Sequence, residues 1–341
     1  MRILRQTMSA GVAAALAMGL GSGLAQAQST EISFILNWVA GGDHAPYYFA
    51  QQEGRYAEAG LDVDIQPGQG SQMSAQRTGL GSSDLGLSDL GTVLVVMGKG
   101  AEMVAVMNVY ANSPYGMYWL KSSGIEGPED FPGHSIGNPP ADAARQMWPA
   151  LAEAVGIPVD SVDWVNVQAN AKLSALKSGA IDVTTSFYNI HHIFSRELGD
   201  DMGYFAWKEY GVNPYGNSII VNAEFLENNR DAVATFVEVT QQAFHDCVET
   251  PEPCVQALVD ANPGLQFDNE LQNWELVTEL MSDETSQTKG LGYFSPERMQ
   301  TDYEFTNTYF EIEVPFEIEN AYTNEFLDTE LKMPVVEWSA N

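Results

Sequence analysis

Aromatic and amide side chains gather directly after the first expected strand of this sequence. Asn37 and Trp38 end the run EISFILNW, and His44 and Tyr47 follow in the next turn and helix. An indole face can stack on a planar ring, whereas an amide or a neutral imidazole can both donate and accept hydrogen bonds. Strand ends are the usual place for a ligand crevice in an α/β sheet. These four residues favour a pocket for a flat heterocycle, although Trp38 could equally be core and His44 a helix cap.

Two further segments of the first half could contact the same ligand. Gly70 and Ser71 form a turn before a helix, which offers backbone N–H groups to a ligand or simply an N-cap. The turn lacks the lysine of a P-loop, so nucleotide binding is not supported. Ser88 and Asp89 end the third expected strand, where Asp89 could accept from an exocyclic amine or cap the following helix.

A second group of candidates lies in the middle of the chain. The candidate ligand contacts there are Asn138, Asp142, Phe187, Tyr188, Asn189, Tyr215 and Asn217. The first two flank a helix N-terminus, where Asp142 could instead offset the helix dipole. The next three end another strand and could form the wall that faces Trp38 across a planar ligand. The last two stand in NPYGN, which serves equally well as a structural turn.

Signatures of catalysis or metal binding are missing from the sequence. The chain contains no HExxH or paired-cysteine zinc motif, and its one GxSxG match, GHSIG at 133–137, overlaps the expected strand HSIGNPP rather than lying at the strand-to-helix turn of a nucleophile elbow. His191 and His192 are adjacent, so their side chains point in different directions, and no carboxylate cluster accompanies them. We therefore expect no catalytic residue, no metal and no cofactor.

Strand-like and helix-like segments alternate along the chain and are joined by short glycine-rich turns. Strands are expected in EISFILN, LDVDIQPG, DLGLSD and AEMVAVMNVY, and the first helix is expected to stop at Gly54 or Gly60. The pattern repeats after about residue 116 in HSIGNPP, VDWVNV and IDVTTSF, and helices are expected from Asn229 onward. Such alternation predicts an α/β fold with parallel sheets covered by helices on both faces.

The same alternation predicts two lobes rather than one. Lobe 1 is expected to comprise residues 28–115 together with residues 218–341, where the chain returns to this lobe and forms the C-terminal helices. Lobe 2 is expected to comprise residues 116–217. A chain of this length commonly divides in this way.

The first 27 residues have the features of a cleaved secretory signal. A basic start with Arg2 and Arg5 precedes the apolar run AGVAAALAMGLGSGLA, and AQA at 25–27 forms an A-x-A cleavage site. The apolar run is short and broken by glycine, which disfavours a membrane-spanning helix. We expect a mature protein that lies in the periplasm.

The net charge restricts the possible binding partners, and the two cysteines are consistent with an exported protein. The formal net charge is −31 at pH 7, and such a surface repels nucleic acid and anionic membranes. Cys247 and Cys254 are the only cysteines, and in an exported protein their spacing predicts one local disulfide at a helix–turn–helix corner.

Long stretches of the sequence resemble one known family. NWVAGGDHAPYYFAQQEGRYAEAGLDVDI is similar to the start of periplasmic solute-binding proteins for thiamine pyrimidine precursors, hydroxymethylpyrimidine and formylaminopyrimidine. The match continues in SSDLGLSDLGTVL, LKSGAIDVTTSF, SIIVNAEFLENNRDAV and NAYTNEFL. The wider family also contains the eukaryotic pyrimidine synthase and binders of riboflavin, alkanesulfonates and nitrate. The resemblance implies a type II periplasmic-binding-protein fold, with two α/β lobes joined by a two-crossing hinge, and a partner ABC permease in the inner membrane.

The sequence departs from the family's synthase at the residues that carry its chemistry. The synthase uses a lysine and a histidine in a G-L-K-x-x-x-H segment, whereas the matching segment here has Ser88 and Thr92. Its cysteine-rich iron-binding run corresponds to YGVNPYGNS, which has no cysteine. Serine cannot form an imine with a cofactor aldehyde, so we do not expect an enzyme.

The resemblance and the residues together imply a monomeric receptor for a small heteroaromatic solute. A thiamine pyrimidine precursor is the leading ligand. Riboflavin, an aromatic acid or an alkanesulfonate are the alternatives within the same class. The alternative of another class is an exported enzyme that acts on a similar solute.

Overall fold

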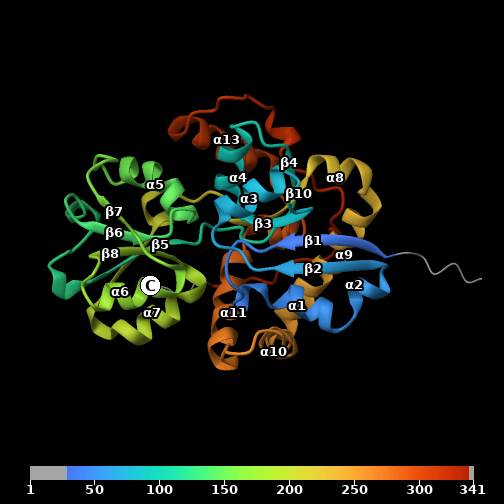
Figure 1. Ribbon diagram of the computed structural model, residues 1–341, viewed down its shortest axis with the longest axis horizontal. Coiled ribbons are helices and arrows are strands. Elements are labelled where there is room, and N and C mark those ends of the chain that lie inside the picture. The colour runs from blue at the N-terminus through green and yellow to red at the C-terminus, as the bar shows by residue number, and fades with distance from the viewer. Residues whose placement is uncertain (1–28, 338–341) are drawn as a thin grey trace, which may run out of the picture.

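The computed structural model describes residues 29–337, which form two lobes placed side by side (Figure 1). Each lobe contains one five-stranded sheet with helices on both faces. The expected signal segment, residues 1–27, lies outside the described residues.

Lobe 1 is built on a sheet with the strand order β2-β1-β3-β10-β4. Its strands are β1 (Thr30–Ile35), β2 (Leu61–Gln66), β3 (Leu85–Asp89), β4 (Met103–Asn108) and β10 (Asn217–Asn222). β1 lies parallel to β2 and β3, but β10 lies antiparallel to β3 and β4. The prediction of purely parallel sheets is therefore wrong. The chain leaves lobe 1 after β4 and returns at the same end into β10, so β10 must run in the opposite direction.

Lobe 2 is built on a sheet with the corresponding order β7-β6-β8-β5-β9. Its strands are β5 (Tyr115–Leu120), β6 (Ser135–Asn138), β7 (Asp163–Asn166), β8 (Val183–Phe187) and β9 (Met202–Ala206). β5 is antiparallel to both of its neighbours, β8 and β9. The sequence pattern does not predict β5, because YGMYWL is buried on both faces and lacks polar alternation.

The helices of the first half follow the strands as expected. In lobe 1 they are α1 (Ala45–Gln52), α2 (Arg55–Glu58), α3 (Ser71–Gly79) and α4 (Leu90–Met97), and in lobe 2 α5 (Ala143–Ala154), α6 (Lys172–Lys177) and α7 (His191–Leu198). Both glycines expected to stop the first helix do so: Gly54 (φ 73°) separates α1 from α2, and Gly60 (φ 83°) follows α2. Positive φ angles of this size favour glycine.

Most of the C-terminal third is helical and packs on lobe 1. Its helices are α8 (Ala223–Asn228), α9 (Arg230–Glu249), α10 (Pro251–Ala261), α11 (Phe267–Met281), α12 (Glu284–Thr288) and α13 (Pro296–Tyr309). The helical prediction fails beyond Tyr309, since the described residues 310–337 contain only the 3-10 turn Ile318–Asn320. This segment instead extends the edge of the sheet, where the Thr323 N–H donates to the Ala105 carbonyl oxygen at 2.9 Å and the Ala105 N–H to that of Ala321 at 2.8 Å. None of the helices in the described part of the chain is long and apolar enough to cross a membrane.

A disulfide joins the two long helices α9 and α10, as the cysteine spacing predicts. The Cys247 and Cys254 sulfurs are bonded, and both side chains are fully buried. Trp274 of α11 donates its indole N–H to the Cys247 carbonyl oxygen at 2.9 Å. The disulfide therefore belongs to the lobe 1 core.

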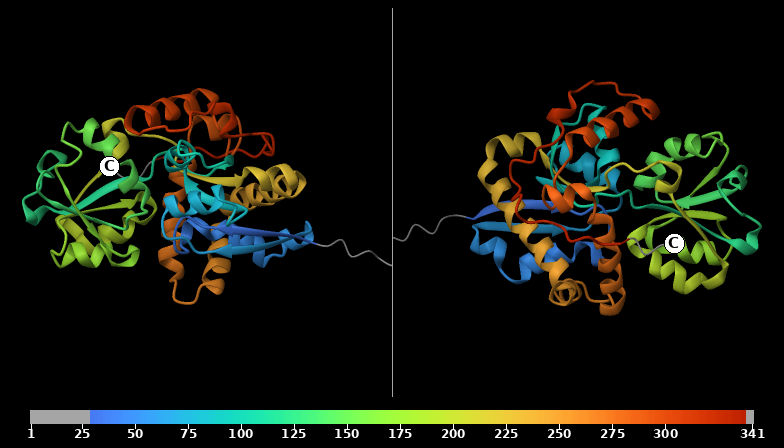
Figure 2. Two further views of the ribbon diagram at one scale, coloured as in Figure 1. Left: turned by 45° about the horizontal axis from the view of Figure 1, so that its top comes forward. Right: turned by 180° about the vertical axis from the view of Figure 1, so that it is seen from behind.

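Two neighbouring segments connect the lobes, as Figure 2 shows from two further sides. The first runs from β4 to β5 and the second from β9 to β10. They are hydrogen-bonded to each other, since the Gly216 N–H donates to the Tyr110 carbonyl oxygen at 2.9 Å and the Tyr110 N–H to that of Asn217 at 2.9 Å. A paired connection of this kind is suited to hinge motion of two otherwise rigid lobes.

Candidate ligand-binding site

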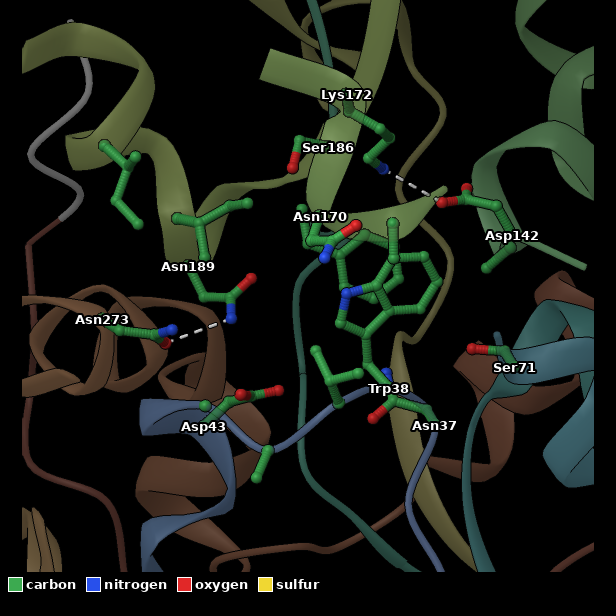
Figure 3. A pocket seen from close by; sticks show the side chains of 18 of the residues that line it. Asn37, Trp38, Asp43, Ser71, Asp142, Asn170, Lys172, Ser186, Asn189 and Asn273 are labelled. Carbon is green, nitrogen blue, oxygen red and sulfur yellow. Dashed lines mark hydrogen bonds and ion pairs between the residues drawn. The ribbon is translucent and has the colours of Figure 1, made fainter. Parts of the chain in front are cut away.

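A cavity of about 240 Å³ lies between the lobes and is drawn from close by in Figure 3. Six sequence-predicted residues line it, namely Asn37, Trp38, Ser71, Asp142, Phe187 and Asn189. The polar lining residues that the sequence analysis did not select as ligand contacts are Asp43, Asn170, Lys172, Ser186, Glu270 and Asn273.

Trp38 and Phe187 supply the aromatic surface of the cavity, one from each lobe. Trp38 lies in the loop after β1 and is partly exposed, whereas Phe187 is the last residue of β8. The Phe187 ring is supported by Tyr115, with ring centroids 5.7 Å apart. Because the two rings come from different lobes, a planar ligand can contact both only when the lobes are close together.

Asn37 is held by buried hydrogen bonds on both sides of its amide. His44, at the end of η1 (Gly42–His44), places Nε2 3.0 Å from Asn37 Oδ1, and Asn37 Nδ2 lies 3.3 Å from Asn217 Oδ1. The Gly41 N–H donates to His44 Nδ1 at 3.2 Å, which favours the neutral tautomer with its proton on Nε2, although Asp43 Oδ1 also lies 3.2 Å from Nδ1. Burial lowers the pKa of His44 despite the opposing charge of Asp43, so the ring is neutral. One N–H of Asn37 remains for a ligand, and His44 orients it without lining the cavity.

Lys172 and Asp142 form a buried ion pair in the lobe 2 wall. Lys172 Nζ lies 3.2 Å from Asp142 Oδ2, and both side chains are only 7% exposed. Asp142 Oδ1 accepts from the Ala144 N–H at 2.9 Å and so caps α5. Lys172 Nζ also lies 5.2 Å from the centre of the Trp38 ring. The positive charge of a lysine at the first position of a helix interacts unfavourably with the helix dipole. This unfavourable placement is the sequence feature that could have identified Lys172 as a functional residue.

The opposite side of the cavity carries two carboxyl groups, Asp43 and Glu270 (Figure 3 labels Asp43). Glu270 of α11 accepts from the Gly42 N–H at 2.7 Å. Burial raises the pKa of Glu270 to about 7, and the nearby charge of Asp43 adds to the rise. Asp43 Oδ2 accepts from the Tyr110 hydroxyl at 3.2 Å. This side of the cavity is therefore rich in hydrogen-bond acceptors.

The lobes touch on both flanks of the cavity. On one flank, η5 (Tyr188–Ile190) meets α11: Tyr188 donates its hydroxyl to Glu279 at 3.0 Å, and Asn189 Nδ2 donates to Asn273 Oδ1 at 3.1 Å. On the other flank, a Cβ placed on Gly70 would lie 2.3 Å from the Ala141 carbonyl oxygen of lobe 2. Gly70 has φ 130°, and it lies beside the cavity rather than lining it.

Three predicted residues are buried behind the cavity wall and make internal hydrogen bonds. Ser88 donates to the Ser71 carbonyl oxygen at 3.0 Å, and Asn138 donates to the Thr185 hydroxyl. Asp89 caps α4 by accepting from the Thr92 N–H at 3.0 Å, and burial raises the pKa of Asp89 to about 6. Their contact with a ligand stays a prediction.

Four other predicted residues are also outside the lining. Tyr47 packs in the lobe 1 core against Phe34, with ring centroids 4.9 Å apart. Tyr215 accepts from the Ser295 N–H at 3.0 Å in the second connection between the lobes. Tyr188 and Asn217 reach the site only through the interlobe and Asn37 contacts described above.

Comparison with known proteins places the chain in a family. A family model described as NMT1/THI5 like matches residues 42–254. The chain belongs to the NMT1/THI5-like family. The formylaminopyrimidine-binding protein of Halalkalibacterium halodurans is 24% identical over 237 residues, which cover 69% of this chain and 72% of that protein. The 4-amino-5-hydroxymethyl-2-methylpyrimidine phosphate synthase of Legionella pneumophila is also 24% identical, over 87% of this chain and 92% of the synthase.

The fold of this NMT1/THI5-like chain is shared with solved binding proteins. The alkanesulfonate-binding protein SsuA of Xanthomonas axonopodis pv. citri superposes with a TM-score of 0.67 and 11% identity, over 87% of this chain and 99% of SsuA. The predicted type II periplasmic-binding-protein fold is thereby confirmed.

Two positions distinguish this NMT1/THI5-like chain from the synthase pattern. Ser88 and Thr92 stand where the resemblance requires a lysine and a histidine, and neither lines the cavity. Thr92 donates its hydroxyl to Asp89 Oδ1 at 3.1 Å, so its role is to close the first turn of α4. Within residues 29–337, no group of three or more His, Cys, Asp or Glu side chains is arranged to hold a metal ion.

Proposed function

We propose that this protein is the solute-binding component of an ABC importer, monomeric and located in the periplasm. It captures a small heteroaromatic solute between its lobes and delivers the solute unchanged to a membrane permease. The observation that carries the proposal is the cavity between the lobes, with Trp38 on one wall and Phe187 on the other. A thiamine pyrimidine precursor is the best candidate, supported by the name of the Halalkalibacterium halodurans relative.

The size of the cavity favours a single ring over a larger solute. Its volume of about 240 Å³ is below the range of roughly 300–1,000 Å³ that is typical of pockets for drug-sized ligands. A pyrimidine with short substituents fits this scale, whereas the three fused rings and ribityl chain of riboflavin require a larger space.

The charge of the cavity disfavours an anionic solute such as a sulfonate. Asp43, Asp142 and Glu270 line it, whereas Lys172 is the one basic side chain among the described lining residues and is paired with Asp142. The carboxylates of Asp43 and Asp142, together with the ionised form of Glu270, repel an anion more strongly than they would in water because the surrounding dielectric is low. The amides of Asn37, Asn170, Asn189 and Asn273 suit an uncharged ring with several hydrogen-bonding atoms.

An enzyme that acts on a similar solute is the second candidate, because the Legionella pneumophila synthase is similar over most of the chain. Lys172 is the lining residue that could be suspected of imine formation. Its Nζ is engaged with Asp142 at 3.2 Å, and an ammonium in an ion pair is a hydrogen-bond donor rather than a nucleophile. Incubation of the purified protein with candidate pyrimidines, followed by chromatography, separates the two functions: recovery of unchanged ligand supports the receptor, and a new product supports the enzyme.

The binding test is a thermal-shift and calorimetric panel of pyrimidines, flavins, sulfonates and aromatic acids. A ligand present at about 100 times its dissociation constant should stabilise the folded protein by about 2.7 kcal/mol. Trp38→Ala should abolish the shift, whereas Trp164→Ala, a change to a partly exposed indole on β7 outside the cavity, should leave it intact. An unaltered thermal shift in Trp38→Ala would show that Trp38 does not contact the ligand, which contradicts the central argument. Preferential binding of a sulfonate would exclude the pyrimidine assignment.

A further inference from the structure

The two polar sides of the cavity differ in hydrogen-bonding character, with Trp38 between them. In Figure 3, Lys172 and Asp142 lie on one side of the Trp38 indole, and Asp43 lies on the other together with Asn189 and Asn273. Lys172 starts α6 in lobe 2, whereas Asp43 belongs to η1 in lobe 1. A ring placed against the indole would therefore meet different partners at its two ends.

At the Lys172 side, the described residues leave ammonium donors unused, whereas each carboxylate oxygen of Asp142 already accepts one hydrogen bond. An ammonium carries three N–H donors, and Lys172 Nζ has one hydrogen-bond acceptor, Asp142 Oδ2 at 3.2 Å. The other carboxylate oxygen of Asp142 already accepts from the Ala144 N–H at 2.9 Å. Two ammonium N–H groups are thus left for a ligand oxygen in a site that is almost fully buried.

At the Asp43 side, carboxyl oxygens dominate. Asp43 is 7% exposed and Glu270 is 9% exposed. Glu270 uses Oε2 to accept from the Gly42 N–H at 2.7 Å, while its Oε1 makes no hydrogen bond within the described residues. A donor such as a ring amine matches this side at neutral to alkaline pH, because the oxygens of Asp43 and of ionised Glu270 only accept hydrogen bonds.

We propose that the cavity selects a bipolar ring, with an amine directed to Asp43 and Glu270 and an uncharged oxygen acceptor directed to Lys172. Lys172 is then a residue that determines specificity by recognising the substituent arm rather than the ring. The acceptor is a carbonyl, formyl or hydroxyl oxygen, since a full anion would meet three carboxyl groups and one already paired ammonium. The inference rests on the proposed function and adds which side chains recognise each substituent of the ligand.

The test is a double-mutant-cycle experiment in which one partner is a group on the ligand. Three probes are titrated calorimetrically: 4-amino-5-(formylaminomethyl)-2-methylpyrimidine, the same ring with a methyl group in place of the formylaminomethyl arm, and the same compound without the ring amine. Each is measured on the wild-type protein and on Lys172→Met. Loss of the arm should weaken wild-type binding by about tenfold to 150-fold, as for a charge-assisted hydrogen bond, and should weaken Lys172→Met by less than about threefold. Loss of the ring amine should weaken ligand binding equally in the wild-type protein and in Lys172→Met.

Two variants keep the test decisive. Asp142→Asn/Lys172→Met removes both charges, so no buried carboxylate is left unpaired, and it should show the same insensitivity to the arm. Lys177→Met removes an exposed lysine of the same helix and should retain the wild-type response to the arm.

The possible failures are distinguishable. If the rings bind but loss of the arm has equal effects with and without Lys172, the bipolar inference is wrong and the receptor proposal survives. If none of the three rings binds, the bipolar inference and the pyrimidine assignment are both wrong. Binding of methanesulfonate or nitrate that disappears in Lys172→Met would show that Lys172 serves an anion, which also overturns the inference.

Discussion

The two walls of the cavity are held in place in different ways. In lobe 1, the loop that carries Asn37 and Trp38 is tied to the next loop by backbone hydrogen bonds, from the Gly68 N–H to Trp38 O at 2.9 Å and from the Gly70 N–H to Asn37 O at 2.8 Å. In lobe 2, the wall depends on side chains, above all the ion pair of Lys172 with Asp142. Under the proposed function, lobe 1 presents a preformed half-site that lobe 2 completes when the lobes close.

The largest expected effect comes from preventing that closure. In Gly70→Ala, the new methyl group would lie 2.3 Å from the Ala141 carbonyl oxygen, at a φ of 130° that only glycine adopts readily. Strain and the clash together should destabilise the closed conformation by about 3 kcal/mol. Calorimetry should then show a roughly 100-fold loss of ligand affinity.

Gly60→Ala is the matched control for the backbone strain. Gly60 also has a positive φ, of 83°, but nothing lies within 4 Å of its added methyl group. Gly60→Ala should lower the free energy of unfolding without lowering the affinity for the ligand. Equal affinity losses in the two variants would mean that Gly70 acts through lobe 1 alone, and the comparison of the walls would need revision.

The difference between the walls also explains which residues were predictable. Phe187 ends a strand and Asn37, Trp38 and Asn189 follow shortly after one, and strand ends of α/β sheets converge on one crevice. Glu270 and Asn273 come from α11, a helix far along the chain, and periodicity says nothing about where such a helix docks. The prediction therefore found several residues at strand ends and missed those carried by the packing of α11, and it also missed Asp43, Asn170, Lys172 and Ser186.

His44 shows a second limit of the sequence pattern. The residue types near Trp38 indicated a hydrogen-bonding site, but they could not separate side chains that face the cavity from those that support them. His44 is fully buried and lies behind Asn37, and Tyr47 belongs to the core. At the level of elements, β5 was missed for a related reason, because a strand buried on both faces has no alternation to detect.

The next effect should separate stability from binding within lobe 1. Cys247→Ala/Cys254→Ala opens a short loop between α9 and α10, and the lost constraint on the unfolded chain should cost about 2–3 kcal/mol in urea unfolding. Ligand affinity should stay unchanged, because neither cysteine lines the cavity. Reductant should destabilise the wild-type protein to the same extent and leave the variant unaffected. A drop in affinity would show that the lobe 1 half-site is less rigid than its hydrogen bonds indicate.

The pH dependence of stability should reveal the acid side of the cavity. Burial raises the pKa of Glu270 from 4.5 to about 7, so between these values the folded protein holds a proton that the unfolded chain releases. The free energy of unfolding should therefore fall as pH rises through this window, by about 3 kcal/mol from this group. Glu270→Gln should remove that part of the decline, and Glu275→Gln, an exposed change on the same helix, should not. Identical pH profiles for Glu270→Gln and the wild-type protein would contradict the assignment.

The smallest effect tests whether lobe 1 is preformed at the level of a single amide. His44→Phe keeps a buried ring but removes the hydrogen bond to Asn37 Oδ1, so the Asn37 amide loses one of its two fixed partners. Ligand affinity should fall by about 1 kcal/mol, or roughly fivefold. His44→Gln retains an N–H donor and should recover most of the affinity even if its melting temperature stays low, which a purely structural role would not produce. If both variants bind as tightly as the wild-type protein, Asn37 is positioned by Asn217 and the backbone alone.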